Sequence, residues 1–377
     1  MKMKTSRIIA TIAASFFIGG TLHAQAWKAK AISDMKKGDF AKVEQTISKL
    51  SQEEQNKHAW LIDSLQAMMS RIRDDFRLSR EEGKKLLLEK VPGATDKQIE
   101  AWKQKKYLET RMIDGEERWF RKTISNFALL NKDAYPTEIV QGKKKEYAKA
   151  HPMCEHILTQ KLEENNTCDW KKVNATFYIE VPADAVPAGE TIKAWLPYPF
   201  DNGRQRNFQL LSSSSQATHS SGSLHHTVYM EQKAVKGQPT RFEMKFSYEV
   251  GAQVFHQADI LNNLKPYDKQ SDLYKKFTAQ ELPHMLVNKQ MKTLAQKIVG
   301  AETNPVLQAS LIYDWISANY PWAGAIDYST IPCIPQYVLD INHGDCGQVT
   351  LLYISLLRSL GIPARWESGW VFDETGW

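Results

Sequence analysis

One short run, Gly344-Asp345-Cys346-Gly347-Gln348, is the part of this 377-residue chain best suited to covalent chemistry. The cysteine follows a glycine turn and opens an apolar stretch typical of a buried helix. Backbone N–H groups at a helix N-terminus stabilise an anion, so a thiol placed there ionises more easily. The spacing therefore predicts that Cys346 is a candidate nucleophile.

The helix end alone would not activate such a thiol strongly. A free thiol has a pKa of about 8.5, so only about 3% is thiolate at pH 7. A helix N-terminus contributes roughly 0.3–1 kcal/mol, which lowers a pKa by about one unit at best. An adjacent imidazole would do far more, while the backbone N–H groups of the first turn can serve as oxyanion donors.

No histidine shows a clear pairing signal with Cys346. His343 is only three residues away, so a local loop would have to fold back on itself, and no histidine follows it. Four others suit surface or strand positions in other segments: His225, His226, His256 and His284. The alternative for Cys346 is a buried structural thiol or a disulfide with Cys333.

The residues after Cys346 predict the buried central helix of a domain. Apolar residues cover almost every face: Val349, Leu351, Leu352, Ile354, Leu356, Leu357 and Leu360. Gly361 ends this helix and Pro363 prevents its continuation. The alternating run 364–370 then predicts a strand beside the helix, and the proline-containing stretch 319–340 is expected to be a loop facing the thiol.

The middle of the chain, residues 165–256, predicts an antiparallel β-sandwich-like domain. Apolar and polar residues alternate along the runs 177–181 and 241–250, as in half-buried strands. Turn-rich spacers separate the runs. The alternation predicts strands but no chemistry.

Residues 25–160 are charged and helical in pattern, and part of them is compatible with a winged helix. Capping boxes at 79–82 and 95–98 flank a Pro-Gly turn, and an Asp-Gly hairpin turn follows at 114–115. Basic residues add charge there: Lys103, Lys105, Lys106 and Arg111. DNA binding is one hypothesis. Because the chain also begins with an export signal, we expect instead a module for docking or packing, and no nucleic-acid partner.

The N-terminus predicts export. A basic segment precedes the apolar run 8–20, which leads to the small residues Ala24 and Ala26. This run is shorter than the roughly 20 residues of a membrane-spanning helix. We therefore predict a signal peptide over 1–24 rather than an anchor. The mature protein would be periplasmic, secreted or at the cell surface, and not attached to the membrane.

Export permits disulfides. Of the four cysteines, Cys154 and Cys168 are the best candidates for a bridge, which could stabilise by roughly 3 kcal/mol. A metal site is the alternative, since His151 and His156 lie nearby, but the spacing matches no standard zinc pattern. We expect no metal ion and no organic cofactor, because thiol acyl transfer needs neither.

The C-terminal third resembles the core of the transglutaminase-like superfamily. The resemblance runs from about residue 307 to 370 and is carried by these motifs: Gly344-Asp345-Cys346, Leu351-Leu352, Leu356-Leu357-Arg358, Gly361-Ile362-Pro363-Ala364-Arg365 and Ser368-Gly369-Trp370. The run Trp195-Leu196-Pro197-Tyr198-Pro199 is similar to the β-domain of bacterial members. The resemblance implies an α+β, papain-like core over 259–377, preceded by the β-domain and the helical region.

The resemblance also implies a Cys–His–Asp triad with Cys346 as nucleophile. The family places its histidine on the strand after a Ser-Gly-Trp-type segment and its aspartate on the next, whereas this sequence stops before either, at Trp377. Two explanations stay open: a fragment of a longer protein, which we favour, or a naturally truncated, inactive relative. We expect the sequence as it stands to have little or no triad-dependent activity.

Two functional hypotheses follow. The first is an exported thiol enzyme acting on amide bonds of proteins or peptides, in which Cys346 attacks a carbonyl to give a thioester. Water would complete hydrolysis, which the bacterial resemblance favours, and an amine would complete transamidation. Phe200, Trp322 and Trp370 could line a peptide cleft, although each also suits a core. The second is a non-catalytic module whose β-domain binds a peptide or glycan. The sequence predicts neither the substrate nor the oligomeric state.

Overall fold

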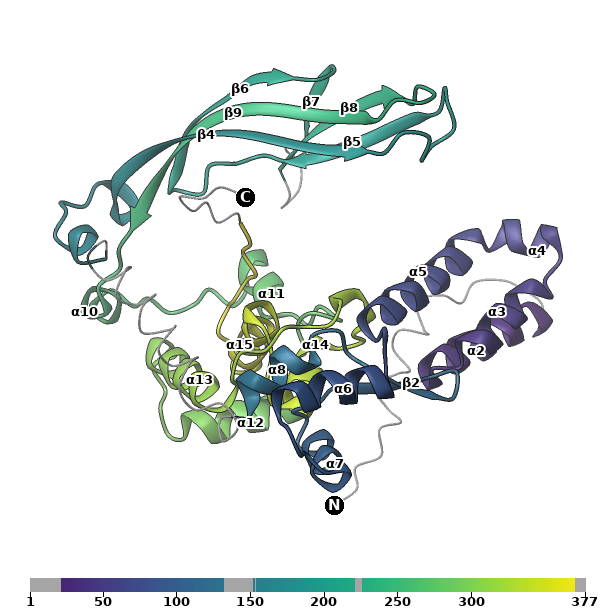
Figure 1. Cartoon of the computed structure of the whole chain (residues 1–377). Helices are drawn as coiled ribbons and strands as arrows, with labels where there is room; N and C mark the ends of the chain where they lie inside the picture. The colour runs from purple at the N-terminus through teal and green to yellow at the C-terminus, as the bar shows by residue number, and fades with distance from the viewer. Residues whose placement is uncertain (1–21, 132–151, 153, 221–225, 370–377) are drawn as a thin grey trace. The chain divides into compact units, whose positions relative to one another are not determined.

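The computed structural model describes residues 22–131, 152, 154–220 and 226–369 (Figure 1). The predicted signal peptide, 1–24, lies outside this part of the chain except for its last three residues, which begin helix α2. Two compact units result: Met1–Ile139 with Pro266–Trp377, and Val140–Lys265. The second unit is therefore inserted in sequence between the two halves of the first. Helices and antiparallel sheets are segregated along the chain, which makes the fold α+β, as predicted.

The first unit begins with four helices: α2 (Leu22–Lys37), α3 (Phe40–Ser48), α4 (Gln52–Lys57) and α5 (Ala59–Asp75). The amphipathic α3 and α5 turn one apolar face inward at helical spacing. Their buried side chains include Phe40, Val43, Leu65, Met69 and Ile72. No helix in the described ranges is long and apolar enough to cross a membrane.

A small mixed module follows, and it contains the predicted capped helices and hairpin. Its elements are β1 (Leu78–Ser79), α6 (Arg80–Lys90), α7 (Asp96–Gln104), β2 (Thr110–Ile113), β3 (Glu116–Trp119) and α8 (Thr123–Leu130). Both predicted capping boxes are formed. The strands make a three-stranded sheet in the order β1-β3-β2. Asp114 and Gly115 link β2 to β3 with φ of 51° and 86°, which is typical of a tight hairpin turn.

The second unit contains the predicted antiparallel β-domain. Its strands are β4 (Thr167–Val181), β5 (Thr191–Pro197), β6 (Gln205–Ser213), β7 (Ala217–Ser220), β8 (Thr227–Lys233) and β9 (Thr240–Gln253). They form two three-stranded sheets, β4-β9-β6 and β5-β8-β7. One apolar cluster joins side chains of both sheets, including Leu196, Val228, Met230, Phe242 and Met244. The alternation read from the sequence therefore predicted the buried face of β9. The short helix α10 (Gln257–Asn262) follows.

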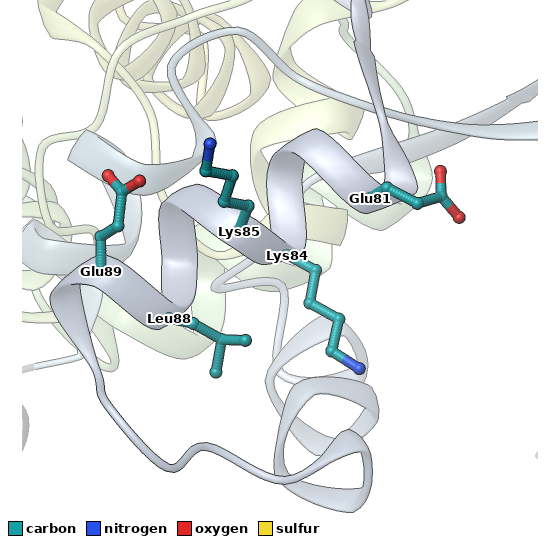
Figure 2. Close-up of a pocket in the computed structure, with 5 residues that line it drawn as sticks. All are labelled: Glu81, Lys84, Lys85, Leu88 and Glu89. Atoms are coloured by element: carbon teal, nitrogen blue, oxygen red, sulfur yellow. The ribbon is translucent and has the colours of Figure 1, made fainter.

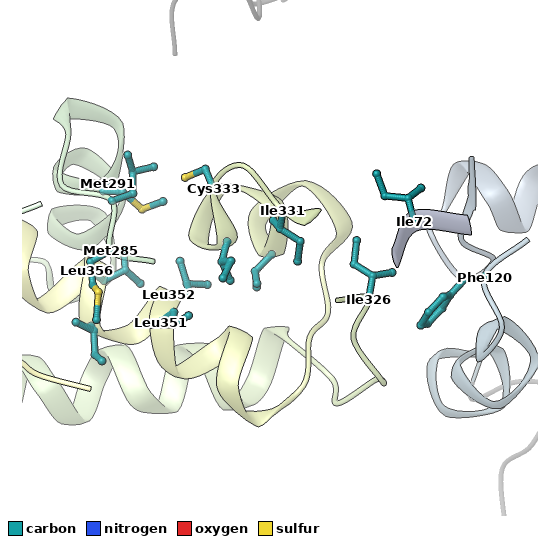
Figure 3. Packing of buried hydrophobic residues seen from close by; sticks show 14 of the residues in the cluster. Ile72, Phe120, Met285, Met291, Ile326, Ile331, Cys333, Leu351, Leu352 and Leu356 are labelled. Carbon is teal, nitrogen blue, oxygen red and sulfur yellow. The ribbon is translucent and has the colours of Figure 1, made fainter. Parts of the chain in front are cut away.

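The chain then returns to the first unit with α11 (Asp272–Thr278), α12 (Lys289–Val299), α13 (Pro305–Asn319), the 3-10 turn η3 (Tyr328–Thr330), α14 (Ile334–Ile341) and α15 (Cys346–Ser359). Helix α15 is the buried central helix that the sequence predicts. Its apolar side chains belong to the same cluster as those of the N-terminal helices. Figure 3 shows this continuity, with Ile72 and Phe120 beside Ile326 at one end and Leu351 and Leu352 further along.

Two local predictions for the C-terminal segment are wrong. The stretch 319–340 is not a continuous loop, because it contains η3 and α14. Pro335 lies in the first turn of α14, where a missing N–H costs nothing. The run expected to be a strand has no regular secondary structure over 364–369, since none of the described strands pairs with it; residue 370 lies outside the described residues. Its backbone is held instead by a bond from Ala364 N–H to the carbonyl of Phe277.

The predicted disulfide is absent, because all four cysteines are free thiols. Cys154 is exposed, whereas Cys168 is buried with its Sγ 3.8 Å from the carbonyl oxygen of Ile157. The described residues include no group of three side chains suited to a metal ion, and the alternative metal site stays a hypothesis. His151, one of its proposed members, lies outside the described residues.

One buried polar contact links the small mixed module to α14. The hydroxyl of Tyr337 donates a hydrogen bond to Oε1 of Glu109. Burial raises the pKa of the Glu109 carboxyl from 4.5 to about 7, with a smaller contribution from the negative charge of Asp75. The hydrogen bond from Tyr337, followed by the charges of Arg111 and Lys106, lowers this pKa. Glu109 is therefore protonated in the folded protein over a pH range in which it is ionised in the unfolded chain.

This shift predicts a pH-dependent stability. Between pH 4.5 and about 7 the folded state binds the extra proton, so the free energy of unfolding should fall as pH rises. The total loss should be at most about 3.5 kcal/mol, because a pKa of about 7 lies about 2.5 above 4.5 and each unit is worth about 1.4 kcal/mol. Glu109→Gln keeps an acceptor for Tyr337 and should flatten this slope in urea titrations at several pH values. The exposed Glu53 supplies the control, since Glu53→Gln should leave the slope as in wild type.

Candidate active site

The start of α15 places the Cys346 thiol at the protein surface. Asp345 is the N-cap residue, and its Oδ1 accepts a hydrogen bond of 2.9 Å from the backbone N–H of Gln348. The Gln348 side chain reaches back to Asp345 N–H at 3.3 Å, which completes a capping box. Cys346 is the first helical residue and is exposed. The interpretation of Cys346 as a buried structural thiol, or as half of a disulfide with Cys333, is therefore wrong.

The helix behind the thiol is held rigidly at its far end. The Ser355 hydroxyl accepts a 3.0 Å hydrogen bond from Leu286 N–H and donates one to the carbonyl of Leu351. Arg358 is only 3% exposed, and its guanidinium donates to the carbonyls of Ala364 and Ala279 and to the Glu281 carboxylate. A buried cation with all these partners fixes the exit of α15, where Gly361 has a φ of 79°.

A second segment runs beside residues 343–347, the turn that presents the candidate nucleophile Cys346 (the nucleophile turn). Trp322 and Gly344 form an isolated parallel β-bridge, with Ala323 N–H donating to the Gly344 carbonyl at 3.1 Å. The Trp322 side chain is 50% exposed at this bridge. The bridge therefore places one of the three predicted cleft aromatics next to the residues that precede Cys346.

Tyr328 of η3 also contacts the first turn of α15. Its hydroxyl donates a hydrogen bond to Oδ1 of Asp345. Burial, then this hydrogen bond and the carboxylate charge, raise the pKa of the Tyr328 phenol, so it remains a donor at physiological pH. The hydroxyl lies so close to Gly347 that a Cβ built there would be 2.3 Å from it. A side chain at position 347 would therefore displace the Tyr328 hydroxyl or the helix turn.

The histidine nearest in sequence is not arranged as a base. His343 is only 4% exposed, and burial lowers the pKa of its imidazole to about 4. It is thus neutral at physiological pH and enclosed. No hydrogen bond or ion pair joins His343 to Cys346 in the part of the chain that the structure describes. This agrees with the doubt that the sequence raises about His343.

The other predicted candidates are described by their own surroundings. Phe200 and His226 stack on each other in the second unit, with ring centroids 4.4 Å apart. His256 precedes α10 in that unit and His284 precedes α12 in the first. Cys333 is buried, which raises the pKa of its thiol. Trp370 and His225 lie outside the described residues.

Reasoning from the sequence missed Tyr328 and the buried residues that hold its loop. The capping box Asp345-x-x-Gln348 was not predicted either, although its pattern is visible in the local sequence. The pocket in Figure 2 is lined by Glu81, Lys84, Lys85, Leu88 and Glu89 of a single helix, α6. Lys84 is already paired with Asp96 at 2.6 Å. The pocket shares no residue with the thiol site.

The structure thus places an exposed, free Cys346 thiol at the capped N-terminus of a buried helix. Residues 292–376, which include Cys346, match the family model of the transglutaminase-like superfamily. The C-terminal segment is thus a transglutaminase-like domain, as the resemblance implies.

Similar proteins were also found. An uncharacterized protein of Haemophilus influenzae is 30% identical over 111 residues, which cover 27% of this chain and 29% of that protein. The chain therefore matches less than a third of that relative's length. Two solved structures are similar. One is a "Putative Cysteine Protease" from Cytophaga hutchinsonii, 18% identical with a TM-score of 0.39, covering 53% of this chain and 66% of that one. The other is a "putative protease" from Parabacteroides distasonis, 13% identical with a TM-score of 0.21, covering 50% and 32%.

The contact between Gly347 and Tyr328 makes a quantitative prediction. Ala is normally preferred to Gly inside a helix by about 1 kcal/mol. Here Gly347→Ala should instead destabilise by roughly 1–3 kcal/mol, because the new methyl group overlaps the Tyr328 hydroxyl. Urea unfolding of the single variants and the double variant measures this.

In the Tyr328→Phe background the overlapping hydroxyl is gone. The nearest remaining ring atom, Cζ, lies 3.2 Å from the place that a Cβ at position 347 would occupy, so most of the penalty should disappear. A double-mutant cycle isolates the coupling between the two positions. Additive effects would contradict the close contact.

Proposed function

We propose that this protein is a thiol acyl-transfer enzyme that acts on amide bonds of proteins or peptides through Cys346. The observation that carries the proposal is the exposed thiol at the capped start of α15, inside a segment that matches the transglutaminase-like superfamily. The thiolate attacks the carbonyl carbon, the amine leaves with a proton, and a thioester remains on Cys346. The Gln348 N–H is hydrogen-bonded to Asp345, so the N–H groups of Cys346 and Gly347 are the ones that suit the oxyanion of that step.

Hydrolysis is the outcome we favour, because the family resemblance is to bacterial members. Water then attacks the thioester, releases the carboxylic acid and returns the proton to the thiol. The resemblance implies that a histidine and an aspartate following the Ser368–Trp370 segment supply the proton transfers. His343 does not suit this role, because it is enclosed and neutral.

We also propose that the protein is exported, on the basis of the predicted signal peptide over 1–24. In that setting the substrate would be a periplasmic or extracellular protein or peptide.

The second candidate function is a binding module whose β-domain recognises a peptide or glycan on a transglutaminase-like scaffold. The exposed Trp195 of β5 and the partly buried Tyr229 of β8 favour it, since their rings pack 4.9 Å apart on paired strands.

Alkylation kinetics test the reactive thiol. In the protein that contains the histidine and aspartate implied by the resemblance, iodoacetamide should label Cys346 at neutral pH at least about tenfold faster than a model thiol, because the helix N-terminus and that histidine favour the thiolate. The second exposed cysteine is removed with Cys154→Ser, and Cys346→Ser supplies the unlabelled control. Peptide mapping by mass spectrometry identifies the modified residue. Labelling at or below the rate of the model thiol would argue for the binding module.

Activity provides the second test. In the protein with its native C-terminal sequence, Cys346→Ala should lower peptide hydrolysis by about a thousandfold or more, since it removes the nucleophile. Cys333→Ala should retain most activity, because the buried Cys333 thiol is not part of the proposed reaction. Equal rates for the Cys346→Ala variant and wild type would contradict the mechanism.

A further inference from the structure

The segment that packs on the nucleophile turn, residues 321–330, is held from both sides. On one side it contacts the turn itself, through the Trp322–Gly344 bridge and the hydrogen bond from Tyr328 to Asp345. On the other side it contacts helices that lie some two hundred positions earlier in the chain. The contacts on the two sides alternate along the segment, so its conformation depends on both.

The first contact from the helical region is a pair of hydrogen bonds made by Asn126 of α8. Its Nδ2 donates to the Gly324 carbonyl at 2.8 Å, and its Oδ1 accepts from Gly324 N–H at 2.8 Å. The Asn126 side chain is 3% exposed, so both bonds are shielded from water. The amide thereby pairs with the backbone as a strand would, one residue after the hydrogen bond from Ala323 to Gly344.

The second contact is made by Asp75 at the end of α5. Its Oδ2 accepts a 2.6 Å hydrogen bond from Asp327 N–H, directly before Tyr328. Its Oδ1 accepts from Arg121 Nε at 3.1 Å, so the buried carboxylate is paired with a cation. Asp75 is 1% exposed. Arg71, one turn earlier in α5, donates from Nη1 to the Ser329 hydroxyl at 2.6 Å.

From this geometry we infer that the N-terminal helical region is part of the thiol site, with Asn126 and Asp75 as positioning residues for Cys346. They act through the segment 321–330, which places the Tyr328 hydroxyl on Asp345 and aligns Ala323 with Gly344. The role of these residues for reactivity rests on the proposed function of Cys346, whereas their role in ordering the turn does not. The helical region therefore serves as a fixed support of the nucleophile turn.

The experiment compares three single variants of the full chain in the Cys154→Ser background: Asn126→Ala, Tyr328→Phe and, as control, Val43→Ala. Val43 is 0% exposed and belongs to α3, which makes no hydrogen bond to residues 321–330 in the described part of the chain. Its truncation destabilises the same unit without touching the segment. Thermal unfolding confirms that each variant is folded at the assay temperature.

The first readout is amide hydrogen exchange by mass spectrometry. Asn126→Ala should speed exchange in peptides covering 321–330 and 343–349 by at least about tenfold, since two shielded backbone groups lose their partners. Tyr328→Phe should speed exchange in the peptides covering 343–349. Val43→Ala should leave exchange unchanged in both sets of peptides. Equal exchange in the Asn126→Ala and Val43→Ala variants would overturn the inference, whatever the reactivity of the thiol.

The second readout is the pH dependence of Cys346 alkylation. Asn126→Ala and Tyr328→Phe should move the pH at half-maximal rate, whereas Val43→Ala should leave it as in the Cys154→Ser parent. A general loss of stability would not move this midpoint. A parent thiol that reacts no faster than a model thiol would contradict the proposed function, while the exchange data would still decide whether the helical region orders the turn.

Discussion

The Asp345 carboxylate is the group on which the geometry of the thiol site depends. One oxygen of this side chain both caps α15, through Gln348 N–H, and accepts the Tyr328 hydroxyl. An N-cap is worth about 1 kcal/mol and a hydrogen bond to a charged group about 1.5–3 kcal/mol. A single carboxylate thus joins the first turn of the helix to the segment beside it, and Cys346 is the next residue. The Gln348 side chain that completes the cap is itself 1% exposed, so this end of the helix is ordered by buried groups.

Successive contacts connect the Asp345 carboxylate to the N-terminal helices. The segment 321–330 contacts the nucleophile turn, and α5 and α8 contact the segment through buried polar groups. Around these polar contacts a continuous apolar cluster runs from the N-terminal helices to α15. Burial of the apolar side chains supplies the bulk of the stabilisation, whereas the polar pairs select one position of the segment. The helical region and the transglutaminase-like segment therefore form one structural unit, although they are far apart in sequence.

Local signals predicted the elements of the fold better than their contacts. Helix α15 was predictable because its start and end are encoded nearby, by Asp345 and by Gly361 with Pro363. Helix α14 was missed because its prolines suggested a loop, although the first helical turn tolerates proline. The expected strand over 364–369 failed because strands require a partner, which alternation alone cannot supply. In the candidate site, the position of Cys346 at the start of a helix was predictable from the local sequence, and its role as nucleophile stays a prediction. Asn126 and Tyr328 were not predictable, because each acts through a contact distant in sequence that leaves no local pattern.

The insertion of the β-domain between the two halves of the first unit has a consequence for biosynthesis. Ile72 and Phe120 pack beside Ile326, yet about 200 residues separate Phe120 from that partner, which at 5–20 residues per second takes roughly 10–40 s to synthesise. During that interval the early helices present an apolar surface whose covering residues the ribosome has not yet made. The first third of the chain therefore cannot complete its core until the last third has been made, while the β-domain can complete its own core as soon as β9 emerges.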